Sequence, residues 1–293
     1  MRGLLFAALC GAALAAVADA ERPPLWPGAR WVDDWYAVEP IDERTFAIAE
    51  PLSPERNVNY LIVGEQRALL FDTGPGLRDI RPVAAALTPL PVTAAFSHLH
   101  NDHVGGLPRF DSIGSLDHPS IRARADADGR FTPSLLQFAS IAPPSWRITE
   151  WWPPDGAIDL GGRTLRVLSA PGHTPESLAL YDEDRHQLFT GDFLYPGDLY
   201  AFVPGSDLAA YRASAKKLLA LTRHRGELAI FGAHVPTTDT PPRQGREDLG
   251  HLEGALADLL EGRAGPWRLA FVSWIPVRRT EFGHGLAILT PLY

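Results

Sequence analysis

Runs of apolar residues along the chain predict a mixed α/β fold. Residues 45–50, 57–64 and 67–74 are apolar or alternating stretches separated by turn-forming residues, which is the pattern of a strand meander. Residues 77–87 carry helical spacing, and the apolar run at 92–96 predicts a buried strand. The order strand, helix, strand therefore leads directly into the polar stretch at 97–106.

A second half repeats this mixture of patterns. Strands are expected at 161–170, 177–182, 186–192 and 227–234, and Asp207 is placed to cap an amphipathic helix that runs to Leu221. Its apolar face is expected to carry Leu208, Tyr211, Ala215, Leu218 and Leu219. A helix near 246–260 and strands near 269–274 and 286–289 are interpreted as covering layers. No repeat or low-complexity stretch interrupts the pattern, so we expect one domain over residues 21–293.

Two segments rich in proline and aromatic residues fit neither period. Residues 21–44 contain Pro23, Pro24 and Pro27 and several aromatic residues, and we favour an extended arm packed on the core over a wall of a substrate site. Residues 107–155 are irregular and also aromatic. Because long irregular segments in compact domains usually have a function, we favour a lid over mere packing for this one.

The N-terminal 20 residues have the pattern of a secretory signal. Arg2 precedes an apolar run to Val17, and Ala18-Asp19-Ala20 forms a small-residue cleavage site. The run is short for a membrane span, so we expect cleavage before Glu21, a periplasmic or secreted protein, and no span after signal removal. A lipoprotein signal at Cys10 is disfavoured because Leu9, rather than a small residue, precedes it.

Composition narrows the possible functions. Cys10 is the single cysteine, so the exported chain would have no disulfide and no thiolate ligand. The formal net charge is −8, and it stays −8 after loss of Arg2 and Asp19. An acidic surface repels phosphate backbones, so a nucleic-acid partner is not expected, and a small-molecule substrate is. The sequence does not indicate an oligomeric state.

The polar stretch SHLHNDHVGG is the strongest chemical signal. It places His98, His100, Asp102 and His103 directly after the apolar run at 92–96. Imidazole and carboxylate groups suit zinc and neighbouring metals, and a turn that leaves a strand end can aim alternate side chains at one point, which a continuous helix could not. The stretch therefore predicts a metal site.

This stretch resembles the signature of the metallo-β-lactamase superfamily. Three further matches follow in the family's order: APGHTPES with His173, FTGDFLY with Asp192, and FGAHVP with His234. The resemblance implies a single-domain αββα four-layer sandwich. It also implies a binuclear site in which Asp192 bridges two metals, and Asp72, in the DTG corner, supports the metal loop from behind. One metal would be held by His98, His100 and His173, and the other by Asp102, His103 and His234.

The expected chemistry follows from this resemblance. Two Zn²⁺ ions per chain are expected, although the same ligands accept iron or manganese. Two such ions roughly 3.5–4 Å apart can share a hydroxide that attacks a carbonyl. Asp102 would combine its ligand role with proton transfer to the leaving group. Tyr195 occupies the position at which acyl-homoserine lactonases of the superfamily carry a tyrosine, so it is a candidate for stabilising the oxyanion; a packed tyrosine is the alternative.

The predicted activity is hydrolysis of an ester, thioester or lactone. The stretches ERNVNYLIVG and YPGDLY are similar to acyl-thioester hydrolases of the superfamily. A β-lactamase is the nearest alternative, although classical β-lactamases of this fold generally lack a bridging aspartate such as the one expected at Asp192. An iron-dependent redox member is a third possibility. Of the remaining histidines, His118 and His284 are the two whose distance from the pocket decides whether they have a role.

Overall fold

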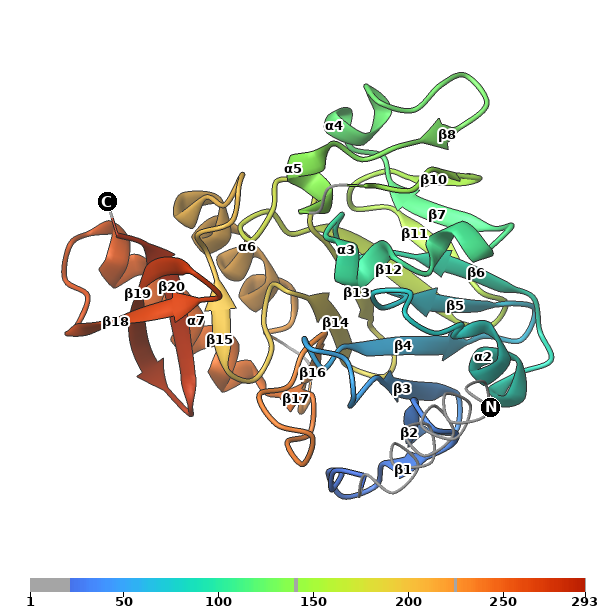
Figure 1. Cartoon of the computed structure of the whole chain (residues 1–293), viewed down its shortest axis with the longest axis horizontal. Coiled ribbons are helices and arrows are strands. Elements are labelled where there is room, and N and C mark those ends of the chain that lie inside the picture. Colours follow the sequence, from blue (N-terminus) through green and yellow to red (C-terminus); the bar gives the residue numbers. More distant parts are fainter. Residues whose placement is uncertain (1–21, 140–141, 224–225, 293) are drawn as a thin grey trace, which may run out of the picture.

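The computed structural model describes residues 22–139, 142–223 and 226–292 (Figure 1). The expected signal at 1–20 lies outside the described residues. Within the part of the chain that is described, no helix is both long enough and apolar enough to cross a bilayer.

The first sheet contains the N-terminal meander and continues through the strand before the metal motif. Its strand order, among the described residues, is β1-β2-β3-β4-β5-β6-β7-β10. Strands β1 to β5 pair antiparallel, whereas β5, β6, β7 and β10 pair parallel. The bounds are β1 Arg30–Trp31, β2 Ala37–Asp42, β3 Thr45–Ala49, β4 Val58–Val63, β5 Ala68–Phe71, β6 Val92–Ala95, β7 Ile113–Leu116 and β10 Glu150–Trp152.

The second sheet contains the strands expected in the second half. Its order is β11-β12-β13-β14-β16-β17, with β14 and β16 parallel and the other pairs antiparallel. The bounds are β11 Ala157–Asp159, β12 Thr164–Ser169, β13 Leu178–Asp182, β14 Gln187–Gly191, β16 Ala229–Gly232 and β17 Arg243–Gln244.

Two smaller sheets complete the strands. A four-stranded sheet of order β15-β20-β19-β18 lies at one end of the molecule (left in Figure 1), and β8 pairs with β9. The bounds are β15 Asp198–Tyr200, β18 Trp267–Val272, β19 Ile275–Gly283, β20 Leu286–Pro291, β8 Arg130–Phe131 and β9 Trp146–Arg147.

Helices cover the outer faces of the two large sheets. Their bounds are α2 Arg81–Leu87, α3 Asn101–Val104, α4 Pro119–Arg122, α5 Leu135–Phe138, α6 Leu208–Leu221, α7 Arg246–Leu260 and the 3-10 helix η1 Leu107–Arg109. Apolar residues of α2 pack with the outer face of the first sheet, and those of α6 and α7 pack on the second. Between the sheets lies a core that includes Tyr60, Phe189 and Phe231, whose rings are in mutual contact. The four-layer αββα sandwich is confirmed.

The long helix of the second half forms as the sequence predicts. Asp207 caps α6 by accepting hydrogen bonds from the backbone N–H groups of Ala209 and Ala210, at 2.8 and 2.9 Å. The helix then runs to Leu221 and buries Tyr211 and Leu218 among others. The earlier helix was predicted too long, because it begins at Arg81 rather than at Leu77. Pro82 lies in its first turn and Leu77 is exposed, so the apolar pattern before Arg81 does not mark a buried face.

The N-terminal aromatic segment packs on the core, as favoured. Trp26 is buried, and its Nε1–H donates to Glu39 Oε2 at 2.7 Å. The segment also supplies β1 and β2, so it extends the first sheet rather than walling a pocket.

The prediction of a lid at 107–155 was wrong. Phe131, Phe138, Trp146 and Trp152 are buried in hydrophobic clusters. Trp152 lies over Gly114, where a side-chain carbon would come within 2.0 Å of the indole ring. Of the described residues in this segment, Ala139 alone borders the main pocket. The aromatic residues are therefore used for packing, because their large apolar surface gains most from burial.

The C-terminal covering layer is more regular than expected. Strand β19 was not predicted, because charged residues interrupt its apolar pattern. One of them, Arg279, binds the carboxylate of Asp198 on β15 with its Nε at 2.9 and 3.0 Å. Polar partners therefore allow a strand where the hydrophobic period fails.

Candidate metal centre

The expected metal ligands converge at the ends of four strands. His98 and His100 follow β6, His173 follows β12, Asp192 follows β14 and His234 follows β16. Asp102 and His103 lie on the short helix α3, where the sequence predicts a turn that leaves the strand end. Because this helix has only four residues, the side chains of Asp102 and His103 can point toward the same space as those of His98 and His100 in the preceding loop.

One group of ligand atoms gathers around the imidazole of His100. Its Nδ1 lies 2.9 Å from His98 Nε2 and 3.1 Å from His173 Nε2. Asp192 Oδ2 completes this group, at 3.5 Å from His173 Nε2 and 3.9 Å from His98 Nε2. All four side chains are buried.

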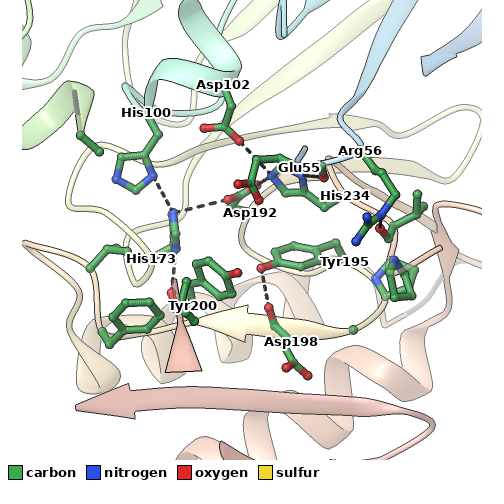
Figure 2. Close-up of a pocket in the computed structure, with 18 of the residues that line it drawn as sticks. Glu55, Arg56, His100, Asp102, His173, Asp192, Tyr195, Asp198, Tyr200 and His234 are labelled. Carbon is green, nitrogen blue, oxygen red and sulfur yellow. Dashed lines mark hydrogen bonds and ion pairs between the residues drawn. The ribbon is translucent and has the colours of Figure 1, made fainter. Parts of the chain in front are cut away.

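A second group gathers on the other side of Asp192 (Figure 2). Asp102 Oδ2 lies 3.3 Å from His103 Nε2 and 3.4 Å from His234 Nε2. Asp192 Oδ1 lies 3.0 Å from His234 Nε2 and 3.3 Å from His103 Nε2. The two oxygens of Asp192 therefore face one group each, as a bridging carboxylate would.

The hydrogen-bond partners behind the histidines fix which nitrogen faces the site. Nδ1 of His173 donates to Tyr200 O at 2.7 Å, and Nδ1 of His234 donates to Glu55 O at 2.9 Å. Nδ1 of His98 lies 3.0 Å from Ser97 Oγ. With Nδ1 engaged in this way, each ring turns the lone pair of Nε2 into the site, which is how metal-binding histidines are usually oriented.

Asp72 forms hydrogen bonds with Ser97 and His103 behind the candidate ligands. Its Oδ2 accepts from His103 Nδ1 at 3.0 Å and from Ser97 Oγ at 2.9 Å, and its Oδ1 accepts from Ser97 N at 2.6 Å. The backbone of Asp72 is left-handed, with φ 66°. Gly191, which precedes Asp192, has φ 54°, and a side-chain carbon there would meet Ser97 Cβ at 2.3 Å. Close approach of β14 to the metal loop therefore needs glycine.

The donor atoms fit two divalent cations. Ligand atoms of a tetrahedral zinc, with bonds of about 2.0–2.1 Å, lie about 3.3 Å apart, and most contacts in the second group are close to this spacing. Asp192 Oδ1 is buried and accepts no hydrogen bond of good geometry, although His234 Nε2 lies 3.0 Å away. Lone pairs packed this closely repel one another unless positive charge lies between them.

The pKa values of the histidines also show that the carboxylates of the second group favour positive charge beside them. Burial lowers the pKa of His234, but Asp192 and Asp102 outweigh it and raise that pKa to about 9. Burial also lowers the pKa of His103, but three nearby carboxylates outweigh it and raise that pKa well above its ordinary value. In the other group, burial and then the neighbouring His173 lower the pKa of His100 to about 3. Its imidazole is therefore neutral at pH 7 and able to act as a ligand.

Two residues that contact Asp102 or lie near it were not recognised from the sequence. Asn57 is buried, and its Nδ2 donates to Asp102 O at 2.9 Å and to Asp102 Oδ2 at 3.2 Å. Glu50 is also buried and accepts from Trp35 Nε1 at 2.8 Å. The signal that could have found Asn57 is its place in ERNVNYLIVG, the stretch similar to thioester hydrolases.

A pocket of about 650 Å³ opens beside the ligand groups. Tyr195 borders it, with its ring 5.2 Å from that of His234, but its hydroxyl donates to Asp198 O at 2.6 Å. Burial and then Asp192 raise the pKa of Tyr195 well above its ordinary value, so the phenol stays protonated. Its role in stabilising an oxyanion stays a prediction.

His118 and His284 lie outside the lining of this pocket. His118 caps α4 through its Nδ1, which lies 3.3 Å from Ser120 N. His284 packs against the ring of His251, and its Nδ1 lies 2.8 Å from Asp248 Oδ1 at the start of α7. Neither side chain is placed to act at the metal centre.

The comparison with known families decides the assignment that the geometry suggests. Residues 53–234, which include all seven convergent side chains, match the family described as the metallo-beta-lactamase superfamily. The chain belongs to the metallo-beta-lactamase superfamily. As such it is a metal-dependent hydrolase.

Similar proteins within the superfamily include named thioesterases. The chain is 30% identical over 215 residues to the acyl-coenzyme A thioesterase MBLAC2 of Homo sapiens, covering 64% of this chain and 77% of the human protein. It is 27% identical over 190 residues to the atrochrysone carboxyl ACP thioesterase of Aspergillus chevalieri, covering 63% and 53%. A solved structure, the metallo-beta-lactamase from Pontibacter korlensis, superposes with a TM-score of 0.57 and 16% identity over 76% of this chain and 99% of that one. The structural likeness shows the shared fold.

Proposed function

We propose that this hydrolase cleaves acyl thioesters at a two-zinc centre. The observation that carries the proposal is the 30% identity to an acyl-coenzyme A thioesterase over most of that protein's length. The pocket supports it, because an apolar wall that includes Tyr200, Phe202, Val272 and Ile275 borders the same space as the ligand groups. Such a wall suits an acyl chain, whereas the ligand groups suit a carbonyl under attack.

The residues that would hold the two zinc ions are those that converge in the structure. His98, His100 and His173 would hold one, Asp102, His103 and His234 the other, and Asp192 would bridge them. Bound there, the ions would supply a water ionised near neutral pH and would polarise the scissile carbonyl. The same nitrogen and oxygen donors would also accept iron or manganese.

The protein's own side chains would manage the proton and the leaving group. In hydrolysis the water oxygen bonds to the thioester carbon, the C–S bond breaks, and the sulfur leaves with the electron pair of that bond. Burial raises the pKa of Asp102, but the neighbouring histidines outweigh it and hold that pKa well below its usual range. Asp102 is therefore ionised and can accept the water proton and pass it on to the departing sulfur. Asn57 keeps the carboxylate of Asp102 in position through its amide.

A substrate panel tests this proposal. The zinc-loaded chain is assayed on a matched thioester, oxygen ester, lactone and cephalosporin, and kcat/KM is compared. Thiol release can be followed directly with a thiol reagent. The background reaction of the protein is small, because Cys10 is the single cysteine of the chain. We expect the thioester to be the best substrate. A cephalosporin or lactone turned over with a higher kcat/KM would replace the proposal by the corresponding activity.

A further inference from the structure

Arg56 borders the pocket with part of its guanidinium unused. Figure 2 shows it on the His234 side, across the pocket from His100 and His173. Its Nε donates to Val235 O at 3.0 Å, and this bond fixes the direction of the side chain. The two terminal nitrogens are left to bind something else, since within the described part of the chain Arg56 makes no ion pair.

The other arginine of the pocket is different. Arg279 binds Asp198 through both Nε and Nη2 and also contacts Glu281, so its charge is already neutralised. Glu55 borders the same pocket but is not paired with Arg56. Arg56 is therefore the cation of this lining whose charge is available to a ligand, in a chain whose net charge of −8 otherwise repels anions.

The backbone of Arg56 is held in an unusual conformation. Its φ is 48°, in the left-handed region of backbone conformation that residues other than glycine and asparagine seldom adopt. The backbone N–H of Arg56 donates to Ser53 O at 3.1 Å, and Asn57 next to it forms a bridge with His234. Strain of this kind is kept where the surroundings demand it, and it often marks a functional site. Here it places a guanidinium beside the loop that carries a metal ligand.

We propose that Arg56 binds a phosphate on the thiol half of the substrate. This inference rests on the proposed function. Thiols that carry acyl groups as coenzyme A or carrier-protein thioesters share a phosphorylated pantetheine arm, and coenzyme A has further phosphates on its nucleotide. A guanidinium with two free terminal nitrogens matches phosphate oxygens in a bidentate manner. Tyr200 lies near His173 at the other end of the pocket and packs against Phe202, 5.2 Å between ring centroids, so the acyl group would occupy that end.

Four thioesters of the same acyl group separate the sources of the phosphate. They are the coenzyme A, 4'-phosphopantetheine, pantetheine and N-acetylcysteamine thioesters, of which the last two have no phosphate. In Arg56→Gln we expect KM to rise about 10-fold to 100-fold for the phosphorylated thioesters, with kcat little changed, because one charge-assisted pair is lost. KM for the two uncharged thioesters should not change. An effect confined to the coenzyme A thioester would assign Arg56 to a nucleotide phosphate, and an effect on 4'-phosphopantetheine as well would assign it to the arm.

Two further variants separate ligand binding from structure. Arg56→Gly removes the side chain but suits φ 48°, so it should fold at least as well and show the same loss. Arg124→Gln is the matched control, because this substitution removes the same charge. Arg124 also donates its Nε to a backbone carbonyl, that of Thr132 at 2.9 Å, but the residue lies outside the pocket lining. We expect Arg124→Gln to behave as the wild type.

The outcomes that overturn the inference are distinct from failure of the proposed function. If the wild type hydrolyses the thioesters but Arg56→Gln and Arg56→Gly change KM equally with and without phosphate, or not at all, Arg56 is not a phosphate ligand. If the wild type hydrolyses no thioester, the proposed function fails, and this inference fails with it.

Discussion

Replacement of Asp72 tests whether the metal loop depends on a carboxylate that would not itself touch a metal. The side chain holds three buried donors: the backbone N–H and Oγ of Ser97, and Nδ1 of His103. In Asp72→Ala these donors lose their acceptor, and a buried unsatisfied donor costs about 1–3 kcal/mol. Alanine at φ 66° adds strain. We expect the free energy of unfolding of the metal-free chain to fall by about 3 kcal/mol or more.

Asp72→Asn separates the metal from the fold. Asparagine tolerates a left-handed backbone and keeps one acceptor oxygen, which can serve Ser97 N or His103 Nδ1 but not all three donors. The variant also removes the negative charge that makes His103 a stronger base. We expect a smaller loss of stability than in Asp72→Ala, together with zinc affinity weakened about 10-fold to 100-fold, the range for loss of a partner behind a metal ligand.

The assay is competition for zinc with a chromogenic chelator, alongside urea unfolding of the metal-free chain. Ser112→Ala is a control, because Ser112 forms a hydrogen bond with Thr93 at 3.0 Å on the same sheet but makes no contact with the ligand groups. Zinc affinity in Asp72→Asn equal to that of the wild type would refute the supporting role of Asp72.

Three further predictions follow from buried polar groups. Tyr195→Phe should lower kcat about 10²–10³-fold with metal content unchanged if its hydroxyl leaves Asp198 O for the oxyanion, and unchanged turnover on the best substrate would assign it to packing. Arg163→Met should lower the free energy of unfolding by about 1–3 kcal/mol in urea titrations, since the buried Asp182 carboxylate loses its nearer cation, 2.7 Å away, and keeps Arg185 at 3.5 Å; a loss under 1 kcal/mol would contradict this. Burial raises the pKa of Glu50 from 4.5 to about 7, so in the folded metal-free chain this side chain holds a proton that the unfolded chain releases, and its contribution to the free energy of unfolding should fall by roughly 3 kcal/mol between pH 4.5 and pH 7. Glu50→Gln should remove that contribution, so the difference in free energy of unfolding between wild type and variant should change with pH over this range, and a constant difference would be inconsistent with the raised pKa.

The convergence of the candidate ligands could be predicted from the sequence because most of them follow a strand with a clear apolar pattern. His173, Asp192 and His234 come after buried strands whose ends meet at one edge of the sandwich. Asp72 could be predicted for the same reason, since β5 precedes it. The short helix under Asp102 could not, because four residues give too little period to distinguish a helix from a turn.

Roles that depend on contacts between distant segments could not be predicted. Asn57 lies 45 residues before Asp102, and only the folded chain shows its amide at that carboxylate. The aromatic residues of 107–155 were assigned to a lid because irregular sequence is ambiguous between covering a pocket and filling a core. Burial of Phe131 and Trp146 decides for the core. Arg56 lies in the same ERNVNYLIVG stretch as Asn57, but its availability follows from the absence of an ion-pair partner among the described residues, which the sequence does not show.

The most direct test of a two-metal thioesterase is turnover of an acyl-coenzyme A thioester as zinc is added to the metal-free chain. With ligand groups centred on His100 and on His103 and one Asp192 between them, turnover should rise until two zinc ions are bound per chain and then level off. Asp192→Ala, which removes the shared carboxylate, should bind zinc poorly at both positions and stay inactive. Full turnover without metal, or a plateau at one zinc per chain, would contradict the account.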